Sequence, residues 1–347
     1  MSSVAPPDPR PLPDDLIPGI LLRLPPDDPA GIVRASAVCK AWRRTIADPA
    51  FAARYRALHP KAPVLGFLHN QSGLHVSRFV PTTSFRPSPA ADHRWRHAHD
   101  CRHGRALFYD YGALQSFVVW DPATGALYQI PEVPDVLTQP AVVCAAAGCD
   151  HRGCGGGPFI VAFAGVENPE DDYHDAHACF YASDTGEWSV HINIHLDHGR
   201  YRLVDRPAAL VGDELYFVGK SGFLLRYRYG LPSAGLSLWR RETTGRVRKA
   251  RSRWVQARVI DLKTMLPVSN PKWKPCLSGV TEGASSVIFV STEEDGVYTI
   301  DLKSSQVKKV CEMGKVDLIL PFVSFYTDSL LLKLANGKLP AANLGNL

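Results

Sequence analysis

The sequence predicts an α+β chain in two parts: a small N-terminal module of three short helices and an all-β, propeller-like domain. Residues 12–60 carry apolar residues at helical spacing, whereas from about residue 63 short apolar runs alternate with turn residues. The 28 prolines and 27 glycines among 347 residues favour many short elements over a few long helices. Residues 1–11 are rich in proline, and we expect a disordered tail there.

Apolar spacing and capping signals predict the helices of the module. Asp28–Pro29 and Asp48–Pro49 each join a capping residue to a proline, which indicates a helix start. The first helix follows from five apolar residues spaced at i+3 and i+4: Leu16, Ile17, Ile20, Leu21 and Leu24. After Asp28, one continuous apolar stripe is predicted from Ile32, Ala35, Cys39, Trp42 and Ile46. So few apolar residues make a thin core, and we expect some of them to contact a partner chain.

The β-rich part repeats one pattern of short strands joined by turns. The pattern occurs at residues 105–131, 159–192, 206–229 and 285–310. An Asp-to-Gly turn precedes an aromatic residue after Asp121 and after Asp184, and Asp301 leads into the last strand pair. Because each unit looks closed on itself, the pattern favours kelch-like propeller blades over a β-sandwich.

Four motifs stand together in the first part of the chain. They are Leu12-Pro13, Leu24-Pro25, Val38-Cys39-Lys40-x-Trp42-Arg43 and Asp48-Pro49-x-Phe51. With them, residues 12–60 resemble an F-box, a module that docks onto the Skp-type adaptor of a cullin-RING ubiquitin ligase. The resemblance implies that eleven residues bind this adaptor: Leu12, Pro13, Leu16, Ile17, Ile20, Leu21, Leu24, Pro25, Val38, Cys39 and Trp42.

The β-rich part has motifs of its own, among them "RFVP", "DCRHGRALF", "VVWDPATGALYQIP" and "ALVGDELYF". They resemble the C-terminal region of plant, particularly grass, F-box proteins, which implies a substrate-recognition domain over residues 63–347. Tyr229-Gly230 runs directly into "LPSAGLSLWRRE", where the likeness implies further strands. We therefore expect an incomplete blade near residues 230–238, and incomplete blades leave open strand edges.

The resemblance implies a function without catalysis. The chain is expected to be the substrate-recognition subunit of an SCF-type (Skp-cullin-F-box) E3 ubiquitin ligase, with a protein target and no cofactor. Two alternatives stay open. One is a propeller that binds proteins outside a ligase, and the other is a propeller enzyme that uses a metal on its histidine and cysteine loops.

The cysteines and histidines do not match a known catalytic or metal-binding pattern. Cys144, Cys149, His151 and Cys154 are spaced C-x4-C-x-H-x2-C, whereas many zinc sites pair C-x2-C knuckles. We interpret this segment as a glycine-rich loop between strands. Cys39 lies beside Lys40, but no histidine follows it closely enough to act as its base. A packed core or interface cysteine is expected there, and no catalytic or metal-binding residue anywhere.

Charge and hydropathy bound the partners and the location. Eight basic residues and one acidic residue lie between Arg240 and Arg258, more than the net charge of +5 for the whole chain. We interpret this segment as a solvated linker, with an acidic partner or nucleic acid less favoured. No uncharged apolar stretch reaches the roughly 18–20 residues of a membrane helix. Eight scattered cysteines fit a reducing compartment, so we expect a cytoplasmic or nuclear protein without nucleic-acid or membrane contacts.

Overall fold

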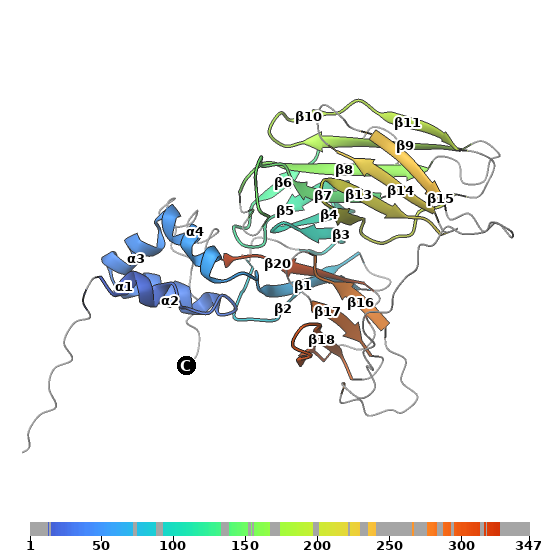
Figure 1. Ribbon diagram of the computed structural model, residues 1–347. Helices are drawn as coiled ribbons and strands as arrows, with labels where there is room; N and C mark the ends of the chain where they lie inside the picture. Colours follow the sequence, from blue (N-terminus) through green and yellow to red (C-terminus); the bar gives the residue numbers. More distant parts are fainter. Residues whose placement is uncertain are drawn as a thin grey trace, which may run out of the picture.

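The computed structural model has helices at the N-terminus and antiparallel sheets after them (Figure 1). It describes residues 13, 15–71, 75–87, 93–132, 139–151, 154, 156–166, 174–196, 201–220, 223–229, 235–240, 266, 276–282, 287–292, 295–312, 316 and 318–326. The tail over residues 1–11 and the basic segment after Arg240 lie outside these ranges. Within them, no helix combines the length and the apolar character needed to cross a membrane.

Four helices, not the predicted three, form the module: α1 (Ile17–Leu21), α2 (Pro29–Val38), α3 (Lys40–Ile46) and α4 (Pro49–Leu58). The predicted continuous stripe is wrong, because an extended backbone at Cys39 (φ −158°, ψ 169°) ends α2 and begins α3. Cys39 Sγ accepts the backbone N–H of Trp42 at 3.5 Å, so the thiol caps α3. Asp48 caps α4 as predicted, since its Oδ1 accepts the N–H of Ala50 at 2.9 Å.

The β-rich part consists of five sheets, numbered here in chain order. Sheet 1 contains β2 (Ser77–Pro81), β1 (Val64–Asn70) and β20 (Ile319–Val323). Sheet 2 contains β3 (Arg96–Arg102), β4 (Arg105–Asp110), β5 (Ser116–Trp120) and β6 (Leu127–Gln129). Sheet 3 contains β7 (Gln139–Cys144), β8 (Phe159–Val166), β9 (His174–Ala182) and β10 (Glu187–Trp188), with β11 (Ile192–Leu196) paired to β9.

Sheets 4 and 5 follow the same plan. Sheet 4 contains β12 (Ala209–Val211), β13 (Glu214–Val218), β14 (Phe223–Arg228) and β15 (Gly235–Arg240). Sheet 5 contains β16 (Cys276–Val280), β17 (Val287–Ser291), β18 (Val297–Asp301) and β19 (Val307–Cys311). Sheets 2 to 5 are thus built from consecutive strands, as propeller blades are. Sheet 1 is different, because the last described strand, β20, pairs with the first, β1.

The predicted incomplete blade near residues 230–238 is wrong. β15 pairs with β14 over its whole length, from Phe223 opposite Arg240 to Arg228 opposite Gly235. Sheet 4 therefore has four strands. The shortened connection does not remove a strand, because a few residues are enough to reverse the chain between antiparallel neighbours.

The predicted Asp turn recurs between the third and fourth strands of sheets 2, 3 and 5. Oδ1 of Asp121 and of Asp301 each accepts two backbone N–H groups at 2.8 to 3.1 Å. The residue before the fourth strand is left-handed in all three turns: Gly125 (φ 82°), Gly186 (φ 73°) and Ser305 (φ 60°). Glycine adopts this conformation without strain, which explains its place in two of the three turns.

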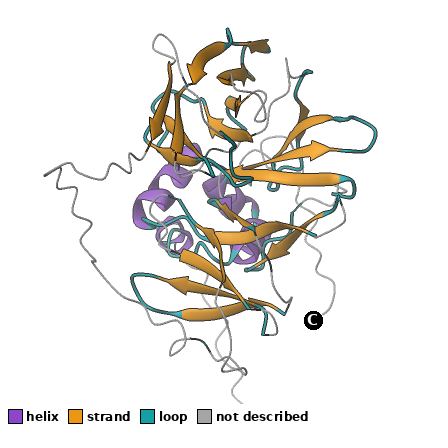
Figure 2. Ribbon diagram, turned by 90° about the vertical axis from the view of Figure 1, so that its right-hand side faces the viewer, coloured by secondary structure: helices purple, strands orange, loops and turns teal. Residues whose placement is uncertain are grey.

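The helices share one hydrophobic core with sheets 1 and 2. Tyr55 on α4 is buried, its hydroxyl donates to the carbonyl of Leu24 at 2.7 Å, and its ring meets Phe325 edge-on at 6.3 Å. Figure 2, viewed from the end opposite the helices, shows them behind the middle of the sheet arrangement. The same core contains Ile17, Leu21, Ile32, Ile46, Phe51, Leu65, Phe85, Trp120 and Phe322. The β-rich part therefore completes the thin core of the helical module.

One buried ion pair links four of the five sheets. Arg102 on β3 donates from Nε and Nη2 to Asp100 Oδ1, both at 3.1 Å, and the two side chains are 6% and 2% exposed. Asp100 Oδ2 accepts the N–H of Val142 on β7 at 2.9 Å. Arg102 Nη2 also donates to the carbonyl of Ala208, next to β12, at 2.6 Å. Its Nη1 lies 3.4 Å from Glu282 Oε1, just after β16.

Replacing Arg102 with methionine tests this link. Burial raises the pKa of Asp100 and of Glu282, and Arg102 opposes both shifts. Arg102→Met leaves the two carboxyl groups without their cation, so we expect the free energy of unfolding to fall by about 3–5 kcal/mol. Urea unfolding measures the loss. Arg228→Met is the control, because its 2.6 Å pair with Glu214 is 44% exposed on the arginine side, and about 1 kcal/mol at most is expected. Equal losses in both variants would contradict the assignment.

Candidate docking site on the helical module

The structure divides the predicted adaptor-binding residues by exposure. Leu12 lies outside the described residues. Six of the others are exposed, two are partly buried and two are buried. The exposed ones are Pro13, Leu16, Ile20, Pro25, Val38 and Cys39, the partly buried ones are Leu24 and Trp42, and the buried ones are Ile17 and Leu21. One apolar pattern thus contains two kinds of residue, and only the exposed kind is available to a partner.

Helix α1 shows this division most clearly. Ile17 and Leu21 are four residues apart and lie in the shared core. Leu16 and Ile20 are also four residues apart and are 51% and 37% exposed. Residues at i and i+4 lie on one side of a helix, so the two pairs occupy different sides. The inward side attaches α1 to the molecule, and the outward side presents apolar surface to solvent.

A third large apolar side chain is exposed where α2 ends. Val38 is 62% exposed, directly before the break at Cys39. We call Leu16, Ile20 and Val38 the docking face. Trp42 on α3 is partly buried and packs against the shared core. Of the two roles expected for Cys39, the packed core is excluded because this residue is exposed, and an interface role stays a prediction.

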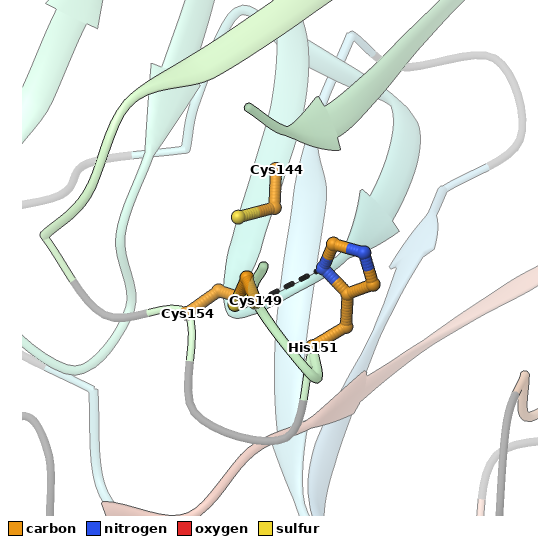
Figure 3. A group of neighbouring side chains, drawn as sticks. All are labelled: Cys144, Cys149, His151 and Cys154. Atoms are coloured by element: carbon orange, nitrogen blue, oxygen red, sulfur yellow. Dashed lines mark hydrogen bonds between the residues drawn. The ribbon is translucent and has the colours of Figure 1, made fainter. Parts of the chain in front are cut away.

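A second group of side chains gathers between β7 and β8, where Cys144, Cys149, His151 and Cys154 meet (Figure 3). Their ligand atoms all lie within 4.8 Å of one another. Among the described residues, this is the one such group of three or more His, Cys, Asp or Glu side chains. The spacing predicted a plain loop here and did not predict that these four side chains converge. Hydrogen bonding with Cys154 lowers the pKa of Cys144 to about 5, against the effect of burial.

A cavity of about 680 Å³ borders on both the buried ion pair and this cysteine group. Its lining comes from sheets 1, 2, 4 and 5 and from the loop after β7. Asp100, Arg102 and Glu282 lie in the wall but are engaged with one another. Burial, followed by neighbouring His151 and Arg102, lowers the pKa of His103 to about 3, so this imidazole is neutral at physiological pH. These groups hold the wall of the cavity together.

Comparison with known proteins agrees with the position of the docking face. Residues 11–53 match the model of the F-box domain, and this range contains α1, α2, α3 and the start of α4. No curated protein matches the sequence.

Solved structures give weaker likenesses. The chain is similar to a chain in the crystal structure of the mitotic checkpoint complex (12% identity, 69% of this chain and 57% of that chain, TM-score 0.26). It is also similar to the WD40 domain of SCAP from fission yeast (10% identity, 67% of this chain and 60% of that chain, TM-score 0.21). It therefore spans less than two thirds of either, and at these TM-scores neither likeness carries an argument. On the family match and the sheet order, the chain has an F-box domain at its N-terminus, followed by a β-rich domain.

Proposed function

We propose that this chain is the substrate-recognition subunit of an SCF-type E3 ubiquitin ligase. F-box domains bind Skp-type adaptors in cullin-RING ligases. The observation that carries the proposal is the exposed docking face inside the residues that match the F-box. Exposed Leu16, Ile20 and Val38 are the kind of apolar anchors that supply most of the free energy of a protein interface.

The β-rich domain, over residues 63–347, is proposed to bind the target. Its consecutive antiparallel sheets support a propeller-like domain, and the pairing of β1 with β20 supports closure of the ring through sheet 1. The kelch-like, grass-type character of this domain, and the boundary between residues 60 and 63, remain predictions. Loops between strands would form the binding face, as they do on many rigid scaffolds.

In this role the chain performs no covalent chemistry. Its contribution is proximity, because a target held by the β-rich domain is brought close to the ubiquitin-charged enzyme of the ligase. The shared core supports this role, since Tyr55 and its neighbours join the F-box to sheets 1 and 2. The alternative is a β-rich protein that binds its partners without joining a ligase, and binding to the adaptor distinguishes the two.

The two sides of α1 predict opposite effects on stability. Leu16→Asp places a charge in solvent, and we expect the free energy of unfolding to change by no more than about 0.5 kcal/mol. Leu21→Asp places a carboxylate in the shared core without a partner, and we expect a loss of more than about 3 kcal/mol. Thermal and urea unfolding measure both. A large loss in Leu16→Asp would show that this side chain is structural.

Binding to a purified Skp-type adaptor tests the proposed function. The double variant Leu16→Asp/Val38→Asp removes two anchors, and we expect the dissociation constant to rise by at least roughly 30-fold. Leu58→Asp is the matched control, because Leu58 is 53% exposed on α4 but lies outside residues 11–53. It should bind as the wild type does. Unchanged binding of the double variant, or no binding by the wild type, would overturn the proposal.

A further inference from the structure

We propose that Cys144, Cys149, His151 and Cys154 bind one zinc ion in a structural site. The four residues supply three sulfur ligands and one nitrogen ligand, and the structure brings all of them to one point (Figure 3). Such a site belongs to the connection between β7 and β8. The proposal does not depend on the function proposed above.

The distances between the ligand atoms fit a tetrahedral site. Zinc lies about 2.3 Å from sulfur and about 2.0–2.1 Å from imidazole nitrogen, which puts tetrahedral ligands roughly 3.5–3.8 Å apart. Cys149 Sγ is 3.5 Å from Cys154 Sγ, and Cys154 Sγ is 3.7 Å from His151 Nδ1. No separation within the group exceeds 4.8 Å. Only small movements of these side chains are needed to complete the tetrahedron.

The backbone of the connection is shaped to gather these side chains. Cys144 is the last residue of β7, and its Sγ accepts the N–H of Ala146 at 3.5 Å. Gly148 (φ 66°) and His151 (φ 55°) are both left-handed, so the chain turns sharply twice between the first and the last cysteine. Left-handed backbone is unusual for a residue other than glycine, and it occurs where surrounding structure or a site requires it. At His151 it accompanies an imidazole whose Nδ1 faces the sulfur atoms.

A neighbouring histidine supports two of the ligands from outside the group. His103 Nδ1 accepts the backbone N–H of Cys144 at 3.0 Å. Its ring is stacked on that of His151, with centroids 4.3 Å apart and planes 15° apart. Contacts of this outer kind orient metal ligands and tune their affinity in known sites. His103 is therefore assigned as a positioning residue.

The ligand chemistry indicates zinc and a structural role. Thiolate and imidazole ligands select zinc over magnesium and calcium, which prefer oxygen. Four protein ligands fill a tetrahedral zinc ion and leave no position for a substrate. A disulfide between Cys149 and Cys154 is the competing state of the same atoms. Their sulfur atoms are 3.5 Å apart, well beyond the roughly 2.05 Å of a disulfide, and both residues are free cysteines.

Metal analysis of the full chain, purified under reducing conditions, tests the proposal. We expect about one zinc ion per chain in the wild type, and at least roughly tenfold less in Cys149→Ser and Cys154→Ser. His103→Ala should keep the ligands and weaken zinc binding by about 10–100-fold. Cys276→Ser is the matched control, since it removes a thiol outside the group and should keep full zinc content.

Two further measurements do not depend on how well a variant folds. Cobalt bound in place of zinc should give the visible absorption of a tetrahedral thiolate site, and His151→Cys should shift this absorption towards that of four sulfur ligands. In the wild type, titration with an organomercurial should release zinc as the cysteines react. A wild type without zinc after reconstitution, a Cys149–Cys154 disulfide in the reduced preparation, or equal zinc loss in Cys276→Ser would overturn the proposal.

Discussion

The arrangement of the sheets depends on one requirement, that the buried guanidinium of Arg102 has acceptors around it. A buried charge without partners costs several kcal/mol, so its acceptors must be held in place. Asp100, the Ala208 carbonyl and Glu282 supply them from sheets 2, 4 and 5, and Val142 on sheet 3 holds Asp100. A sheet that shifted would leave a charge or a polar group unpaired. The ion pair therefore fixes the mutual position of these sheets, which hydrophobic contacts alone do not define so strictly.

The turns were predictable from the sequence because short-range chemistry determines them. An aspartate that accepts two backbone N–H groups, followed by a left-handed glycine, needs no information from elsewhere in the chain. The pairing of β1 with β20 was not predictable, because the two strands lie at opposite ends of the β-rich part. The fourth strand of sheet 4 was missed for a different reason. A short connection was taken as a missing strand, although antiparallel strands need few residues between them.

The candidate site was predictable in its residues but not in their roles. Apolar spacing identified Leu16, Ile17, Ile20 and Leu21 together, and the β-rich domain decides which of them are buried. Spacing also concealed the break at Cys39, because two helices of suitable phase imitate one longer stripe. The cysteine group behaved in the opposite way. Its irregular spacing gave no signal, since convergence depends on two left-handed residues that a spacing rule does not represent.

The shared core around Tyr55 has a geometric consequence. Because the helices and sheets 1 and 2 bury the same side chains, the chain has no hinge at this joint. A partner on α1 and a partner on the β-rich domain are then held at one distance and one angle. The lysines that come within reach of a bound enzyme are set by the shape of this chain, and not by a search of a tethered target. A change of a single core side chain at the joint would redirect the target without altering either binding surface.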